Sequence, residues 1–205
     1  MATYIGNDNN NNTGSEQNQY GIGGDDRLAP NSNNKSYFLY GGNGDDELLG
    51  FDYDDEIYGG RDQDDLYGYD GYDYLDGGTG GDLLYGGYGN DTLSGGPGQD
   101  TFVFDTALNK KYNFDTILDF ASGSGGDLID LSRSIFTGVG NANNFLQSKK
   151  FEVGSEATSS KTRILYNKDK GVAYYTPDGS NGSQTKFFKV TKGLSLDSDD
   201  FYIIA

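Results

Sequence analysis

The sequence has no cysteine, no histidine and no tryptophan among its 205 residues. Without cysteine there are no disulfides, no thiol nucleophile and no zinc site built on thiolates. Without histidine there is neither a Ser-His-Asp relay nor a histidine-ligated zinc. Among the common general bases only carboxylates, lysine and tyrosine remain.

Basic and apolar residues are also scarce. Lys and Arg total 15 against 32 Asp and Glu, which gives a net charge of −17 and argues against nucleic acid as a partner. Apolar residues reach only 34%, and no run approaches the roughly 18 residues of a transmembrane helix. The first residues, MATYIGNDNNNN, lack the basic and apolar stretches of a Sec leader.

Glycine, in contrast, is abundant, at 33 residues of 205. The excess acid lies in the first half, where Arg61 is the only basic residue between 41 and 103. Composition of this kind is typical of a disordered chain. An internal repeat argues against disorder, at least once the charges are neutralised.

Seven consecutive units of nine residues fill positions 41–103. In every unit position 1 is glycine, position 6 is aspartate and position 8 is a bulky apolar residue. The aspartates are Asp46, Asp55, Asp64, Asp73, Asp82, Asp91 and Asp100. The apolar residues are Leu48, Ile57, Leu66, Leu75, Leu84, Leu93 and Phe102. Two looser copies precede them: GIGGDDRLA (21–29), with Asp26 at position 6, and SNNKSYFLY (32–40), which has no carboxylate.

Each unit is long enough for one tight turn and one short strand. Glycines in the turn permit positive φ, and a strand over positions 7 to 9 points one side chain inward. Two units would form one coil, with strands alternating between two facing parallel sheets. Turns on the same edge then stack about 4.8 Å apart, and their aspartates with them. Such like charges need a counter-ion, and calcium, which takes oxygen ligands in flexible geometry, suits them better than magnesium.

The pattern GGxGxDxUx, with U apolar, resembles the RTX, or haemolysin-type calcium-binding, repeat family. The resemblance implies an all-β fold, a calcium-binding parallel β-roll (solenoid), with several calcium ions between same-edge turns. It also implies that the ligands are the position 6 aspartates, Asp26 included, and loop carbonyls. The carbonyls on complete loops belong to Gly42, Gly44, Gly78, Gly80, Gly87, Gly89, Gly96 and Gly98.

The implied ions lie between aspartates of alternate repeats. One edge would hold Asp46, Asp64, Asp82 and Asp100 and the other Asp55, Asp73 and Asp91, which gives about five interior positions and leaves Asp100 at the end of its column. Four residues depart from the glycine pattern and put the loop geometry of the middle repeats in question, namely Phe51, Tyr53, Asp62 and Tyr69.

Beyond Val103 the sequence changes character and predicts a β-rich C-terminal cap. FVF (102–104), DTILDF (115–120) and DLIDLS (127–132) read as strands that continue the roll, because a solenoid end must be covered. TRILYN (162–167) and GVAYYT (171–176) predict a hairpin, with TKFFKVT (185–191) as a third strand. Together with the terminal SDDFYIIA, these segments resemble the cap and secretion region of type I exported RTX proteins. That resemblance implies an uncleaved C-terminal signal; the tail is equally readable as an ordinary last strand.

We therefore predict three regions: 1–40 with degenerate repeats and an N-terminal cap, the 41–103 roll, and the 104–205 cap and secretion region. The predicted function is that of a secreted, non-enzymatic calcium-binding protein, extracellular or at the cell surface, with a structural, matrix or adhesive role. It would use type I secretion machinery and fold on calcium outside the cell.

Two alternatives stay open. The chain could be the C-terminal module of a larger exported enzyme of the protease, lipase or alginate epimerase type. It could also bind extracellular polysaccharide through tyrosines expected on the surface, namely Tyr58, Tyr67, Tyr72, Tyr85 and Tyr88. Edge packing and strand propensity explain the same tyrosines without a ligand.

Overall fold

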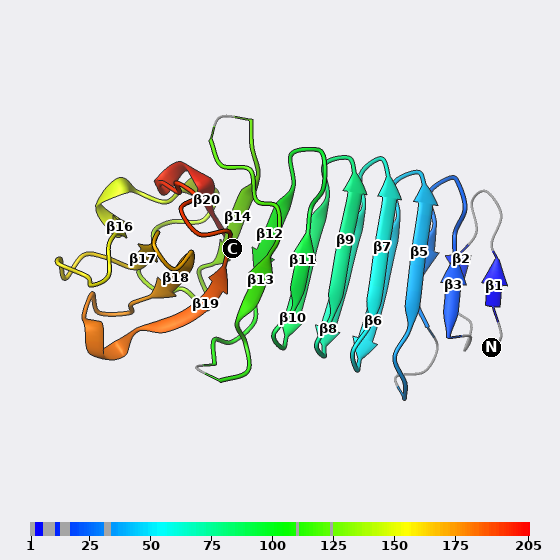
Figure 1. Ribbon diagram of the computed structural model, residues 1–205, viewed down its shortest axis with the longest axis horizontal. Coiled ribbons are helices and arrows are strands. Elements are labelled where there is room, and N and C mark those ends of the chain that lie inside the picture. The colour runs from blue at the N-terminus through cyan, green and yellow to red at the C-terminus, as the bar shows by residue number, and fades with distance from the viewer. Residues whose placement is uncertain (1–2, 6–10, 13–16, 31–33, 110, 124) are drawn as a thin grey trace.

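The computed structural model describes residues 3–5, 11–12, 17–30, 34–109, 111–123 and 125–205. Two sheets face each other along the long axis of the molecule, and successive strands alternate between them from β1 to β14 (Figure 1). The all-β parallel β-roll predicted from the sequence is therefore confirmed. The N-terminal region predicted over 1–40 lies partly outside the described residues.

One sheet has eleven strands and the other has nine. In spatial order the first contains β1 (Thr3–Ile5), β3 (Asn18–Tyr20), β5 (Phe38–Asn43), β7 (Glu56–Arg61), β9 (Tyr74–Thr79), β11 (Thr92–Ser94), β13 (Asp115–Ile117), β19 (Thr185–Lys189), β18 (Val172–Tyr175), β17 (Ile164–Asn167) and β16 (Phe151–Val153). The second contains β15 (Asn144–Phe145), β20 (Phe201–Ile204), β14 (Leu128–Ser132), β12 (Thr101–Phe104), β10 (Leu83–Tyr88), β8 (Asp65–Asp70), β6 (Glu47–Asp52), β4 (Arg27–Leu28) and β2 (Asn11–Asn12).

The position 8 side chains form the core between the sheets. Leu39 pairs with Ile57 in the first sheet and Leu48 with Leu66 in the second, so neighbouring strands are two nine-residue units apart. Each of these side chains is at most 1% exposed along the whole roll: Leu28, Leu39, Leu48, Ile57, Leu66, Leu75, Leu84, Leu93 and Phe102. Because a single position 8 side chain per strand faces inward, the core is one residue wide on each sheet. So narrow an apolar core cannot by itself offset the free-energy cost of burying polar and charged groups.

The turns adopt a left-handed backbone at position 2 of every repeat and at position 4 of every repeat except those of Gly71 and Gly98. Gly78, with φ of 101°, and Gly80, with φ of 156°, show this in a complete repeat. The four non-glycine residues at these positions have the same sign of φ, from 72° to 84°: Phe51, Tyr53, Asp62 and Tyr69. The loop geometry that their side chains put in question is thus retained, because strand pairing continues through the turn from Phe51 to Tyr69 and on to Gly87. Each such residue costs about 1 kcal/mol or more.

The chain beyond Phe104 closes the roll with the strands expected there. β13 and β14 add one further coil, β17 and β18 form the expected antiparallel hairpin, and β19 pairs with both β18 and β13. β20 lies between β14 and β15, with Phe201 and Ile203 fully buried. Three short 3-10 helices lie in this part: η1 (Ser148–Lys150), η2 (Asn181–Ser183) and η3 (Ser198–Asp200). Within the described ranges, no helix has the length and apolar character needed to cross a membrane.

Candidate metal centre

The position 6 aspartates form a hydrogen-bonded column along each edge of the roll. Each stands just before its strand, is at most 3% exposed, and accepts through Oδ1 a hydrogen bond from the backbone N–H of the corresponding residue one coil earlier, which is an aspartate in every case but one. The N···O distances are 2.8–3.0 Å. One edge runs through Asp46, Asp64, Asp82 and Asp100, and the other through Asp55, Asp73 and Asp91. Asp26 begins the first column by donating to Asp46, and Tyr37 begins the second by donating to Asp55.

The second carboxylate oxygen of these side chains has no hydrogen-bond partner within the protein. Oδ2 is buried and unsatisfied in Asp46, Asp55, Asp64, Asp73, Asp82, Asp91 and Asp100. Buried polar atoms are nearly always paired, and an unpaired carboxylate oxygen is costly. Seven in regular array therefore indicate a missing ligand that repeats with the coil.

The same oxygen explains the glycine at position 1. A Cβ on Gly77 would lie within 3.0 Å of Asp82 Oδ2, and one on Gly59 would lie within 3.0 Å of both Asp64 Oδ2 and the Gly77 carbonyl oxygen. All seven position 1 glycines place their missing Cβ within 3.0 Å of the aspartate of their own repeat: Gly41, Gly50, Gly59, Gly68, Gly77, Gly86 and Gly95. These residues do not have positive φ. Glycine is needed here to leave room for the carboxylate.

Gly77→Ala is expected to destabilise the roll by about 1–3 kcal/mol, because the new methyl group must displace either the Asp82 carboxylate or the backbone. Chemical denaturation in excess calcium measures the free energy of unfolding. The control is Gly182→Ala, whose Cβ meets nothing within 4 Å. Equal stability of the two variants would contradict the steric role given to position 1.

Burial raises the pKa values of the column aspartates well above the ordinary 3.8. The pKa of Asp64 and Asp73 rises to about 8, first through desolvation and then through neighbouring carboxylates, while the backbone hydrogen bond opposes the shift. Desolvation likewise raises the pKa to about 7 in Asp46, Asp55 and Asp100 and to about 6 in Asp82 and Asp91. The columns are thus poorly compatible with charged aspartates unless positive charge is brought to them.

Backbone carbonyls surround the columns. The carbonyl oxygens of Gly42, Gly78 and Gly80 point at the Cα of the corresponding glycine one coil later, Gly60, Gly96 and Gly98 respectively, so a Cβ there would collide with them. Gly44 lies over the carbonyl of Gly24 in the same manner. The turn carbonyls are thus stacked between coils beside the carboxylates.

Two of the predicted carbonyls meet a different neighbour. The Gly87 oxygen accepts a hydrogen bond from the Thr106 hydroxyl at 2.9 Å, and the Gly89 oxygen accepts from the Phe114 N–H at 3.2 Å. A carbonyl has two lone pairs, so each keeps one for another ligand. Thr106 and Phe114 thus occupy the place of the next turn on this edge.

Both columns continue one coil further than the repeat indicated. Asp91 N–H donates to Asp115 Oδ1 at 3.1 Å, and Asp100 N–H donates to Asp127 Oδ1 at 3.0 Å. Burial raises the pKa of both Asp115 and Asp127, as it does within the roll. Asp100 is consequently not the end of its column. The signal in the sequence is the Asp-x-apolar triplet of DTI and DLI, which longer loops displace from the nine-residue frame.

The donors fit a hard divalent cation. They are all oxygens, carboxylate and carbonyl, which calcium prefers, and they come from flexible turns at a spacing that suits several ions in a row. Among the described residues no three acidic side chains converge on one point. A cation held here must therefore take carbonyl oxygens as well as carboxylates.

Comparison with known proteins gives a family match over most of the chain. The family model described as "Peptidase M10 serralysin C terminal" matches residues 16–203. Twenty-four chains of solved structures match. One is the solution structure of the AlgE6R3 subunit from the Azotobacter vinelandii mannuronan C5-epimerase, which has 30% sequence identity and a TM-score of 0.46; the match covers 75% of this chain and 80% of that one. No curated protein matches the sequence.

Proposed function

Because the chain belongs to the Peptidase M10 serralysin C-terminal family, whose RTX-type β-roll domains bind calcium, we propose that its own aspartate columns hold calcium ions on which folding depends. The observation that carries this proposal is the row of buried, unsatisfied Oδ2 atoms. A calcium ion between the coils would supply the positive charge that balances these carboxylate oxygens. Its binding free energy then becomes folding free energy.

The proposed ligands are the seven column aspartates of the repeats, Asp26 at the start and Asp115 at one end. Asp127 ends the other column with both oxygens hydrogen-bonded, Oδ1 to the Asp100 N–H and Oδ2 to the Ala121 N–H at 2.7 Å. The carbonyls of Gly42, Gly44, Gly78, Gly80, Gly87, Gly89, Gly96 and Gly98 complete the set. The proposal gives this module no catalytic role, since each column carboxylate is committed through one oxygen to the backbone of the adjacent coil. It would act as a structural, matrix or adhesive element, or as the terminal module of a larger exported enzyme.

A calcium titration tests the proposal directly. Far-UV circular dichroism of the chelator-treated protein is expected to show little strand signal from the roll. Millimolar calcium should restore the signal, and the same concentration of magnesium should not, because magnesium demands a tighter octahedron and retains its water. Identical spectra with chelator and with calcium would show that the columns do not need an ion.

We further propose that the protein leaves the cell through a type I system, with the signal in the last residues of the 104–205 region. The resemblance of the terminal SDDFYIIA to such signals supports this, and so does calcium-dependent folding, which would keep the chain unfolded in calcium-poor cytosol. Extracellular or cell-surface location follows from that route. The three-region division at 40 and 103 is part of the same proposal.

Deleting residues 193–205 is expected to retain the protein in cells that carry a type I exporter. The deletion also removes Phe201, which is fully buried in β20, so it disturbs the cap as well as the signal. Phe188→Ser is the matched control, because the buried Phe188 ring packs on that of Phe201, with centroids 6.3 Å apart, and its loss disturbs the same packing while residues 193–205 stay unchanged. Immunoblots of cells and medium should show export of the control alone. Export of the deleted chain would place the signal elsewhere.

A further inference from the structure

Two adjoining cavities lie where the outer face of the second sheet meets the turns. The first, of about 490 Å³, is open to solvent and lined by the turns after β8 and β10 and by residues 107–109 and 112–113. The second, of about 400 Å³, lies over β8 and β10 themselves. Both are lined by Asp70, Tyr88 and Ala107, so they form one continuous groove. We call it the tyrosine groove, after Tyr67, Tyr69, Tyr72, Tyr85, Tyr88 and Tyr112.

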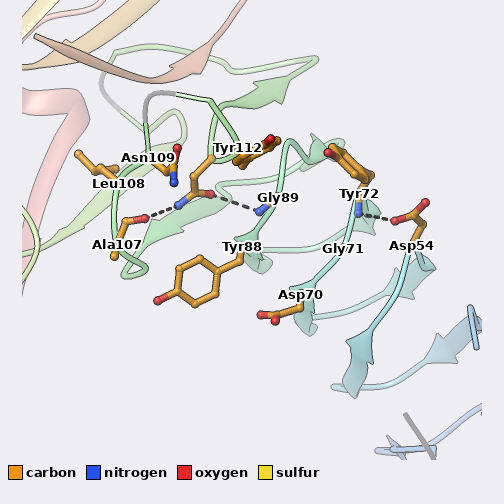
Figure 2. A pocket seen from close by; sticks show the side chains of 11 residues that line it. Asp54, Asp70, Gly71, Tyr72, Tyr88, Gly89, Ala107, Leu108, Asn109 and Tyr112 are labelled. Carbon is orange, nitrogen blue, oxygen red and sulfur yellow. Dashed lines mark hydrogen bonds between the residues drawn. The ribbon is translucent and has the colours of Figure 1, made fainter. Parts of the chain in front are cut away.

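The tyrosine rings of the groove fall into two groups. Tyr67 stacks on Tyr85 with ring centroids 4.5 Å apart and on Tyr69 at 6.0 Å, so these half-buried or partly exposed rings fix one another over the sheet. At the first cavity, Tyr72, Tyr88 and Tyr112 are 50–55% exposed. Figure 2 shows these three rings and the Asp70 carboxylate around the first cavity. Large aromatic surfaces left exposed on fixed backbone are suited to stacking on a ligand.

Other polar groups of the groove hold its walls together. Asp54 accepts a hydrogen bond from the Tyr72 N–H at 2.9 Å. The Asn113 amide donates to the Ala107 carbonyl at 3.0 Å (Figure 2). It also donates to the Thr106 hydroxyl at 3.1 Å. This wall is tied to the roll by the Thr106 hydroxyl, which donates to the Gly87 carbonyl at 2.9 Å, and by the Phe114 N–H, which donates to Asn90 Oδ1 at 3.0 Å. Asp70 lines both cavities and Asp105 lines the second, and each adds a carboxylate to the groove.

The charge of the groove restricts what can enter. Its carboxylates are Asp54, Asp70 and Asp105, and the Lys111 ammonium lies beside it, 4.4 Å from the centroid of the Tyr112 ring. Three carboxylates against this one ammonium give the described part of the groove a negative charge, which disfavours phosphates, sulfates and uronates. Six tyrosines outnumber the carboxylates, so stacking on an uncharged, flat-sided molecule is the dominant interaction available.

We propose that the tyrosine groove binds a glycan chain built of uncharged pyranose rings. Pyranose C–H faces stack on tyrosine, and carboxylates such as Asp70 accept hydrogen bonds from sugar hydroxyls. Two cavities joined at Tyr88 provide room for consecutive rings of one chain. The inference rests on the proposed function, because the groove walls are turns of the calcium-dependent roll.

The test uses the full chain in millimolar calcium, after circular dichroism has shown that the roll is folded. Isothermal titration with neutral cello-, manno-, xylo- and chito-oligosaccharides is expected to show binding of at least one. Tyr88→Ala should weaken it by about tenfold or more, while Tyr88→Phe, which keeps the ring, should stay within about twofold. Tyr40→Ala is the control, an exposed tyrosine on the other sheet.

Three outcomes overturn the inference. The first is that none of the neutral oligosaccharides binds the folded protein. The second is that Tyr88→Ala binds like Tyr40→Ala. The third is that only oligouronates or the deacetylated, cationic chito-oligosaccharides bind, which would show that the groove recognises the charge of a glycan and not its uncharged rings. All three leave calcium-dependent folding intact. A roll that fails to fold in calcium would overturn the proposed function, and the groove with it.

Discussion

Calcium-free protein is expected to be unfolded over its roll at neutral pH and to regain strand structure when the pH is lowered below about 6. The reason is that burial raises the pKa of the column aspartates in the fold to about 6–8, against 3.8 for an ordinary aspartate. The folded state then binds protons more tightly than the unfolded state. Stability from these groups is complete below pH 3.8 and is lost as the pH rises through 6–8.

Calcium reverses the sign of this dependence. An ion bound to the carboxylates competes with protons, so the calcium-loaded roll is expected to be most stable at neutral pH and to release its ions on acidification. Circular dichroism across the pH range, with chelator and with excess calcium, measures both curves. They should cross. A calcium-free protein whose strand signal stays equally low at neutral and acid pH would show that charge burial is not what keeps the apo-protein unfolded.

Asp73→Asn is expected to stabilise the calcium-free roll and destabilise the calcium-loaded one. Burial raises the pKa of Asp73 to about 8, so its charged form is strongly disfavoured in the fold. Asparagine is neutral at every pH and keeps Oδ1 as the acceptor for the Asp55 N–H, which lies 2.8 Å away. The pH at which half of the calcium-free protein is unfolded should therefore rise. The free energy of unfolding of the calcium-free protein should increase by about 1 kcal/mol or more.

With calcium the same variant loses a charged ligand. Each tenfold loss of calcium affinity lowers the free energy of unfolding by about 1.4 kcal/mol when calcium is in excess, and denaturant titration measures this fall. Asp70→Asn is the control, because it removes one charge from an exposed position at the end of β8, the strand that precedes Asp73 in the chain. A change of the same sign with and without calcium would mean that Asp73 is not a ligand.

The sequence was sufficient to predict the roll because one nine-residue frame encodes both the strand and the turn. The inward residues, such as Leu66 and Leu75, follow directly from position 8. The strands of the cap were predicted as well, since β-branched and aromatic runs such as TRILYN and TKFFKVT are bounded by turn residues.

The candidate site was less accessible to sequence reasoning. Asp115 and Asp127 lie 24 and 27 residues after their partners in the column, so a frame based on period alone excludes them. Position 1 glycine suggested turn flexibility, whereas its role depends on a carboxylate that folds back over it from five residues further along the chain. Nor could the sequence show that Phe51 and Tyr53 adopt the positive φ that glycine favours, because the strand pairing that holds them in this conformation comes from neighbouring coils.

The two-unit coil makes the length of this protein adjustable in fixed steps. Removing residues 59–76, one complete coil, would leave every later strand in its own sheet and every later aspartate in its own column, because neighbours in both are 18 residues apart. Removing only nine residues would transfer β13 and β14 to opposite edges and turn the whole cap half a revolution about the roll axis. Insertions and deletions in such chains should therefore be inherited as pairs of repeats, and an engineered spacer could be lengthened coil by coil with the same two ends.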